Sequence, residues 1–152
     1  MALKCKNKHM IKELKLSMLF FILVFNVSAQ ELKVNITGLR NDVGVIRLAF
    51  FIDSESFKNE TPEISKTISK KNINNNNLTV VLTDIPPGRY GVALLDDENK
   101  DGDMDYNLLG IPKEGFGFSN LNPGGLRKPD FESFTFDFYE DKTIEIKVRY
   151  IY

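Results

Sequence analysis

The chain has 152 residues, of which 42% are hydrophobic and 27% charged, with a net charge of −1. This length favours one domain over two. The slightly acidic balance argues against a nucleic-acid or anionic-membrane surface, because both kinds of surface need an excess of Lys and Arg.

Residues 1–29 have the layout of a secretory signal peptide. A basic start, MALKCKNKHMIKELK, precedes the apolar run LSMLFFILVFNV and small residues that end at Ala29. The apolar run is too short for a comfortable membrane span, which needs about 20 residues. We therefore expect cleavage after Ala29 and export to the periplasm, outer surface or medium of a bacterium. The alternative is an uncleaved anchor, whereas the mature chain should not insert into a membrane.

Loss of this segment changes the charge and the available chemistry. Removing its five Lys and one Glu from the 20 basic and 21 acidic side chains leaves 15 against 20, a net charge of −5. Cys5 and His9, the only Cys and His, are lost as well. Residues 30–152 therefore have no disulfide, Ser-His-Asp triad or Cys-His dyad, and almost no route to a zinc site. Hydrolysis by a carboxylate pair, such as Glu114 with Asp105, is the enzymatic option that remains.

Residues 30–152 read as one domain of short strands. Residues 32–39, LKVNITGL, alternate apolar and polar side chains with the period of a half-buried strand. Further strand-like runs occupy 45–52, 78–82, 89–95, 131–139 and 142–152. Short strands at this spacing predict an all-β fold, an antiparallel β-sandwich of about seven strands.

Two stretches interrupt the strand pattern. Residues 53–77 end in NINNNN, and we expect a mobile loop with a short helix near residues 54–60. Residues 96–130 form a long connection rich in Gly, Pro and Asp. Long connections in compact domains are often functional, so this one is the first place to look for a site.

Residues 96–105, DDENKDGDMD, concentrate negative charge directly after a predicted strand. Oxygen-bearing side chains alternate at Asp97, Asn99 and Asp101, and Gly102 follows them. This is the first half of the calcium-loop pattern D-x-[DN]-x-[DN]-G. Calcium takes six to eight oxygens at loose geometry, so alternate side chains can converge on it as the chain turns.

The remaining ligands of such a loop would come from further along the chain. Asp103 would offer its backbone carbonyl and Asp105 its carboxylate, while Asp96, Glu114 or water could complete the shell. Leu108 occupies the twelfth position, where an EF-hand needs a bidentate Glu. The pattern thus predicts a weak structural Ca²⁺ site, of the order of 10⁻⁴–10⁻³ M. The alternative is a solvated acidic turn, since Asp, Asn and Gly are also turn residues.

Residues 108–120, LLGIPKEGFGFSN, alternate glycine with phenylalanine. Glycine lets the backbone approach a neighbour closely, and phenylalanine favours burial or a partner. The segment is either a loop anchored by two core aromatics or a recognition surface beside the acidic loop. The candidate recognition residues are Tyr106, Lys113, Phe116, Phe118 and Asn120.

Residues 84–120, DIPPGRYGVALLDDENKDGDMDYNLLGIPKEGFGFSN, resemble the signature of DUF2141, a family of secreted bacterial proteins of unknown function. The similar features are a PPG-x-Y turn, a strand, a D-E-N-x-x-G-x-x-D loop and LGIPKEG-aromatic-GFSN. A looser resemblance extends from about Leu32 to Tyr150. Family members often carry His where this chain has Asp96. The resemblance implies a β-sandwich of immunoglobulin or transthyretin type outside the cytoplasm, and no established activity.

These observations favour a non-catalytic binding module. In this interpretation the acidic loop orders residues 115–120, and the two present one surface to an envelope glycan, peptide or protein. The absence of Trp weakens the glycan version. The alternatives are a structural or interaction protein of the cell envelope without metal, whose sheet edge pairs with another chain, and a carboxylate-based hydrolase.

Overall fold

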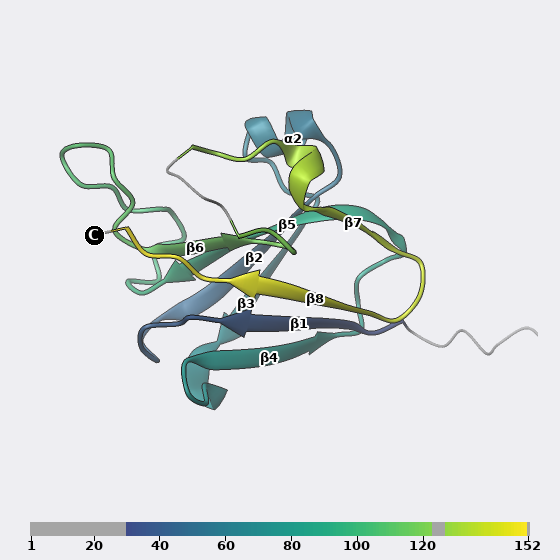
Figure 1. Cartoon of the computed structure of the whole chain (residues 1–152), viewed down its shortest axis with the longest axis horizontal. Helices are drawn as coiled ribbons and strands as arrows, with labels where there is room; N and C mark the ends of the chain where they lie inside the picture. Colours follow the sequence, from purple (N-terminus) through teal and green to yellow (C-terminus); the bar gives the residue numbers. More distant parts are fainter. Residues whose placement is uncertain (1–29, 123–126, 152) are drawn as a thin grey trace, which may run out of the picture.

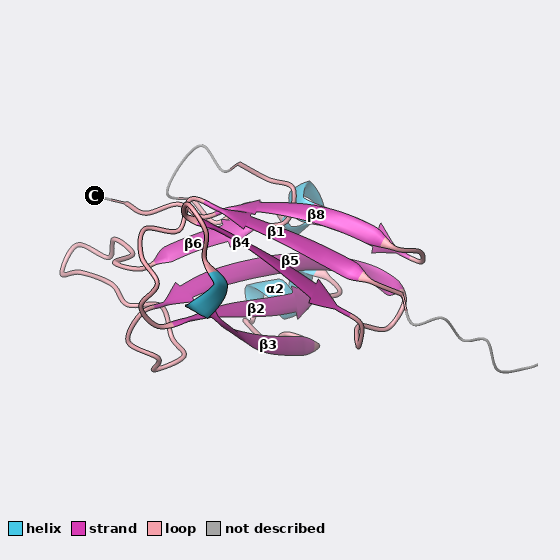
Figure 2. Ribbon diagram, turned by 90° about the horizontal axis from the view of Figure 1, so that it is seen from below, coloured by secondary structure: helices cyan, strands magenta, loops and turns pink. Residues whose placement is uncertain are grey.

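Two β-sheets pack face to face around one apolar core, as the two layers of strands in Figure 2 show. The structure is a computed structural model that describes residues 30–122 and 127–151. The predicted signal peptide lies outside these residues. Within them, no helix has the length and apolar character that crossing a membrane requires.

The first sheet contains three strands in the order β4-β1-β8. Their bounds are β1 (Leu32–Thr37), β4 (Asn77–Leu82) and β8 (Lys142–Lys147). β1 pairs with β4 antiparallel but with β8 parallel. A parallel pair needs a crossover, and here the chain reaches β8 only after passing through the other sheet. The sheet is therefore mixed, which departs from a wholly antiparallel sandwich.

The second sheet contains five strands, four of them in the order β3-β2-β5-β6, while β7 pairs with the first part of β5. All of its pairings are antiparallel. The bounds are β2 (Val45–Phe51), β3 (Ile64–Ser69), β5 (Gly88–Asp97), β6 (Gly115–Phe118) and β7 (Thr135–Phe138). The all-β sandwich is confirmed, with eight strands in the described residues, and its immunoglobulin or transthyretin type stays a prediction.

Alternation along the strands builds the core. Leu32, Val34 and Ile36 of β1 are fully buried, as expected for a strand with every second side chain facing inward. They pack with the inward side chains of the second sheet, including Ile46 and Val92. The opposite, outward face of the second sheet is also partly covered. Helix α2 (Ser54–Lys58) and the 3-10 helix η2 (Phe131–Phe134) lie over it side by side (Figure 1).

Three sequence expectations about these elements were wrong in part. The short helix near residues 54–60 is present as α2, but residues 64–72 form β3 and the 3-10 helix η1 (Lys70–Asn72) rather than a mobile loop. The long connection from residue 96 contains β6. The strand expected over 131–139 begins at Thr135, because η2 precedes it. β3 and β6 flank the central strands, and their sequences lack the long apolar runs of β2 and β5.

The alternation of glycine and phenylalanine in β6 has a steric cause. A Cβ added to Gly117 would lie 2.7 Å from Cγ2 of Ile146 in β8, and one on Gly115 would lie 2.5 Å from the Tyr150 ring. No side chain fits at these distances. The glycines therefore let β6 lie against β8 and the C-terminal segment, and the intervening phenylalanines point to the opposite face.

One polar group of the core is fully enclosed. Lys70 is buried, and its Nζ donates to Asp96 Oδ1 at 2.6 Å, to the carbonyl of Val43 at 2.8 Å and to Asn41 Oδ1 at 3.1 Å. The Tyr150 hydroxyl donates to Asp96 Oδ2 at 2.5 Å. A buried ion pair with its hydrogen bonds satisfied tolerates the loss of both partners better than the loss of one.

We expect Lys70→Met to lower the free energy of unfolding by about 3–5 kcal/mol, because it leaves the Asp96 carboxylate buried without a cation. The double variant Lys70→Met with Asp96→Leu should recover most of that loss. Urea unfolding at neutral pH measures both. A loss in the single variant no larger than that of an exposed ion pair, about 1 kcal/mol, would contradict the buried pair.

Candidate functional site

The acidic run begins with three residues that each pair with a basic side chain of the protein. Asp96 binds the buried lysine described above. Asp97 accepts from Arg47 Nε at 2.5 Å, and Glu98 accepts from Arg40 Nε at 2.7 Å. Because β5 runs through residue 97, Asp96 and Asp97 point to opposite faces of the second sheet. The charge at the start of the run is thus neutralised from both faces.

Asp97 organises the turn that follows β5. Its side chain is fully buried, Oδ1 accepts from the Lys100 N–H at 2.7 Å, and Oδ2 accepts from the Gly102 N–H at 3.1 Å. Gly102 has φ +96°, and a Cβ there would lie 3.3 Å from the Arg47 guanidinium carbon. Glycine at this position therefore serves both the turn and the close approach of Arg47.

Asn99, Asp101 and Asp105 converge beyond this turn. The Asn99 amide donates to Asp101 Oδ2 at 2.7 Å and to Asp105 Oδ2 at 3.3 Å. Asp101 Oδ1 also accepts from the Asp103 N–H at 3.0 Å. The Asp103 N–H and the Asn99 amide hold the pKa of Asp101 below its usual range. The structure thus brings three of the predicted ligands together, and the Asn99 amide donates to the carboxylates of the other two.

The two carboxylates expected to complete a calcium shell have other partners. Asp96 points to the inter-sheet side, and Glu114 is buried against the loop backbone. Glu114 accepts from the Glu98 N–H at 2.9 Å and from the Asp105 N–H at 3.4 Å, so it ties the two ends of the loop together. Across residues 30–122 and 127–151, no three His, Cys, Asp or Glu side chains are placed to hold a metal ion.

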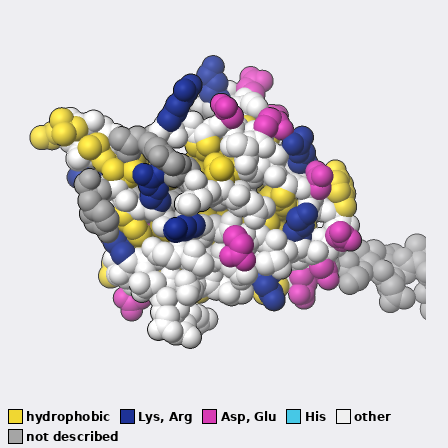
Figure 3. Space-filling view, in the orientation of Figure 1, with side chains coloured by type: hydrophobic (Ala, Val, Ile, Leu, Met, Phe, Trp, Pro, Cys, Tyr) yellow, Lys and Arg dark blue, Asp and Glu magenta, His cyan; other side chains and the backbone are white. Residues whose placement is uncertain are grey.

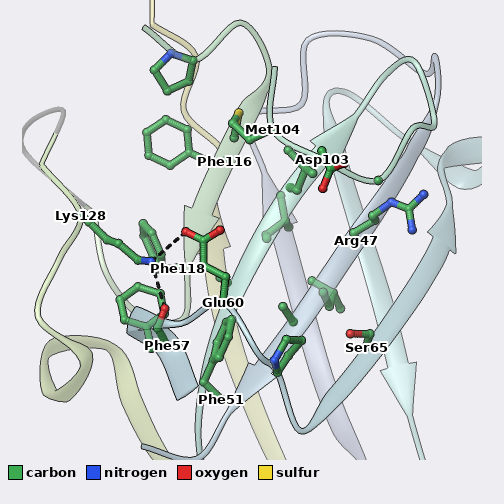
Figure 4. Close-up of a pocket in the computed structure, with 18 of the residues that line it drawn as sticks. Arg47, Phe51, Phe57, Glu60, Ser65, Asp103, Met104, Phe116, Phe118 and Lys128 are labelled. Carbon is green, nitrogen blue, oxygen red and sulfur yellow. Dashed lines mark hydrogen bonds and ion pairs between the residues drawn. The ribbon is translucent and has the colours of Figure 1, made fainter. Parts of the chain in front are cut away.

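A groove of about 580 Å³ lies beside this loop, on the outward face of the second sheet (Figure 4). Its floor consists of outward side chains of the three adjacent strands β2, β5 and β6, whose register aligns them. These are Ala49, Ala93, Leu95, Phe116 and Phe118. The volume falls in the range of ligand-binding pockets, about 300–1,000 Å³.

An aromatic cluster forms one wall of the groove. Phe57 of α2 lies 5.2 Å from Phe51 and 4.9 Å from Phe134, measured between ring centroids, in edge-on contacts. Phe118 lies 5.0 Å from Phe134. A Cβ on Gly91 would lie 2.6 Å from the Phe134 ring, so this glycine lets the cluster rest directly on β5. Interlocked rings of this kind make a rigid apolar wall.

The loop from residue 102 to residue 112 forms the opposite wall. Asn107 holds its tip, because its Oδ1 accepts from the N–H groups of Leu109 and Ile111 at 2.9 and 3.0 Å. Leu108 and Leu109 are exposed, at 106% and 84% of their reference areas. The green loops at the left of Figure 1 mark this end of the sandwich, and Figure 3 shows hydrophobic side chains gathered there.

Charged side chains border the apolar floor, and they are called here the rim of the groove. Those that line it are Arg47, Lys66, Arg127 and Lys128, against the acidic Glu60 and Asp103. Lys128 and Arg47 lie at opposite ends in Figure 4. The lining is therefore net positive, although residues 30–152 are net negative.

The recognition residues expected from sequence divide into two groups. Tyr106, Phe116 and Phe118 line the groove. Lys113 and Asn120 do not, and Asn120 instead joins β6 to β8, since its N–H donates to the Glu145 carbonyl at 2.7 Å. Phe118 is buried while Phe116 is partly exposed, so the segment is both a core anchor and part of an open surface.

Sequence reasoning missed the groove residues that come from other segments, among them Arg47, Phe57 and Lys128. The one local signal was in β2, where Arg47, Ala49 and Phe51 alternate with inward side chains. That pattern shows an outward face that is apolar at two positions out of three. It does not indicate which distant segments border that face.

Comparisons with known proteins give a family and no function. A family model described as an uncharacterized protein conserved in bacteria matches residues 34–147, which is well over half of the chain. No curated protein and no solved structure matches the chain.

Calcium binding by the acidic loop stays a prediction, and the donor set has the right chemistry for it. Calcium at about 100 times its dissociation constant adds about 2.7 kcal/mol, so the unfolding midpoint should rise by several degrees. Binding through Asp97 competes with Arg47, so Arg47→Met should enlarge the rise. Thermal unfolding in chelator, calcium and magnesium measures this, and no calcium-specific rise in either protein would contradict the prediction.

Two carboxylates of the loop should respond to acid with opposite signs. The hydrogen bond from Arg40 holds the pKa of Glu98 below its ordinary 4.5, so the stability that Glu98 contributes is lost as pH falls through the lowered value. Burial raises the pKa of Glu114 above 4.5, so its ionisation costs stability above the raised value, and protonation relieves that cost as pH falls.

The free energy of unfolding of the wild type should therefore fall relative to that of Glu98→Gln as pH drops below 4.5. Relative to that of Glu114→Gln, it should rise as pH falls toward 4.5. Urea unfolding of the three proteins between pH 7 and pH 3 gives both differences. If both stability differences changed with pH in the same direction, the environments described for Glu98 and Glu114 would be contradicted.

Proposed function

The chain belongs to the DUF2141 family of uncharacterized bacterial proteins, and we propose that it is an exported, non-catalytic binding domain whose ligand lies in the groove of the second sheet. The observation that carries this proposal is the groove itself. Its floor side chains Ala49, Ala93, Leu95 and Phe116 are partly exposed between two structured walls, and the rings of the aromatic wall are buried against one another. Apolar concavities with polar groups at the rim are the usual form of small-ligand sites.

The hydrogen bonds of the loop carboxylates support the proposal that the domain is not an enzyme. The pair with hydrolytic potential was Glu114 with Asp105. Glu114 accepts two backbone N–H groups of the loop and does not line the groove, and residues 30–152 contain no His or Cys. Export rests on the signal-like layout of residues 1–29.

The envelope alternative, in which a sheet edge pairs with another chain, receives less support. Edge strand β3 is short and places Lys66 between Ser65 and Thr67. A charged residue on a short, polar edge strand opposes pairing with a second chain. The outward groove is the better candidate for an interaction surface.

The absence of Trp from the chain makes a direct test of the groove available. In Leu109→Trp, the single indole lies in the groove wall, and binding of the apolar probe N-phenyl-1-naphthylamine should shift its emission to shorter wavelength. In the control Val81→Trp, an exposed position on the first sheet, the emission should not move.

A blocking variant completes the test. Ala93→Phe adds a ring to the groove floor without removing any contact, and it should weaken probe binding at least about tenfold, equivalent to about 1.4 kcal/mol. Equal probe binding by the wild type and Ala93→Phe, or equal emission shifts at positions 109 and 81, would contradict the proposed site.

A further inference from the structure

The five side chains of the groove floor carry no hydrogen-bonding group, and the hydroxyls of Ser65 and Thr67 line the groove only at the neighbouring edge strand β3. The floor side chains are aliphatic or phenyl, and the β2 and β5 backbones beneath them are paired on both sides. A sugar or an extended peptide placed there would lose hydrogen bonds to water without replacing them, which costs free energy for every polar group. A hydrocarbon chain loses none, so the floor favours an acyl chain.

The rim supplies the opposite chemistry. Four basic side chains and two acidic ones line the groove. Arg47 and Lys66 are already paired with Asp97 and Asp84, so the rim attracts an anionic group where a cation is exposed and weakly paired, as at Lys128. The complement of this groove is therefore a molecule with a hydrocarbon body and an anionic end.

The basic side chains differ in how firmly they are held. Arg47 pairs with the fully buried Asp97, and Lys66 pairs with Asp84 outside the groove lining. Lys128 pairs with Glu60, whose side chain is 80% exposed, and Lys128 is itself 44% exposed. Exposed pairs of this kind are weak and exchange partners easily.

Lys128 also contacts the apolar wall directly. Its Nζ lies 4.4 Å from the centroid of the Phe57 ring and donates to the Phe57 carbonyl at 3.0 Å. Figure 4 shows its amino group next to Phe57 and Glu60. An anion that replaces Glu60 at Lys128 would therefore lie where the hydrocarbon wall begins.

We propose that the groove binds a single-chain anionic amphiphile, a long-chain carboxylate, with its acyl chain over the floor and its carboxylate at Lys128. This inference rests on the proposed function and deepens it by assigning the ligand class. The apolar floor is complementary to the acyl chain, and the basic rim is complementary to the carboxylate.

Competition for the bound naphthylamine probe tests the class. Dodecanoate, dodecanol and dodecyltrimethylammonium share one chain length and differ in charge, and all are used below their micellar concentrations. Dodecanoate should displace the probe best and the ammonium compound worst. Added salt should weaken dodecanoate and leave dodecanol unchanged, because salt screens the charge at the half-exposed Lys128.

Two variants of one ion pair separate charge from structure. Lys128→Gln and Glu60→Gln each break the same ion pair, and Lys128→Gln also removes the contacts of Lys128 with Phe57, so dodecanol binding is measured in each variant as its own baseline. Lys128→Gln should weaken dodecanoate about threefold to fivefold, and Glu60→Gln should strengthen it by a similar factor. Each change is taken relative to dodecanol binding by the same variant, which removes any effect of the substitution on the groove itself.

The outcomes distinguish this inference from the proposed function. Probe binding with no preference for dodecanoate, or changes of the same sign in the two variants, would overturn the anionic amphiphile and leave the groove as a binding site. Displacement of the probe by unrelated extended peptides better than by dodecanoate would also overturn it. Failure of the groove to bind any apolar probe would overturn both.

Discussion

The close approach of β6 to β8 and the C-terminal segment is the steric constraint on which the groove depends. Only glycine fits at residues 115 and 117, and a strand with glycine on one face can present large side chains only on the other. The two phenylalanines are thereby directed to the outward face, where Phe118 meets the rings of Phe57 in α2 and Phe134 in η2, and Phe116 packs on Phe118. The same contact that closes the sandwich on one side thus builds the apolar surface on the other.

Charge pairing performs a similar double role at the end of β5. Three consecutive acidic residues bind cations from three different segments, namely η1, β2 and the loop after β1. These pairs fix the beginning of the acidic loop on both faces of the sheet, and Glu114 fixes its end through the backbone. The groove wall formed by residues 102–112 therefore stands on a braced base rather than on a free turn.

Local pattern was enough to predict the sandwich, because the alternation of β1, β2 and β8 depends only on neighbouring residues. It was not enough for the site. Spacing marked Asp97, Asn99 and Asp101 as loop residues, but the partners of the run's first three acids lie 26, 50 and 58 residues away. The groove likewise combines Arg47, Phe57 and Lys128, which no sequence period connects. Such pairings follow from tertiary packing, which a single sequence does not display.

The parallel pairing of β1 with β8 has a consequence for the order of folding. Leu32 is aligned with Lys142, so the first strand gains its second neighbour only when almost the last strand is present. Closing a loop of this size carries an entropy cost before any contact rewards it, and folds rich in such distant pairings form slowly, in milliseconds to seconds. The first sheet therefore cannot be completed before β8 has been synthesised. Until then β1 can pair only with β4, and the edge of β1 that β8 covers stays unpaired.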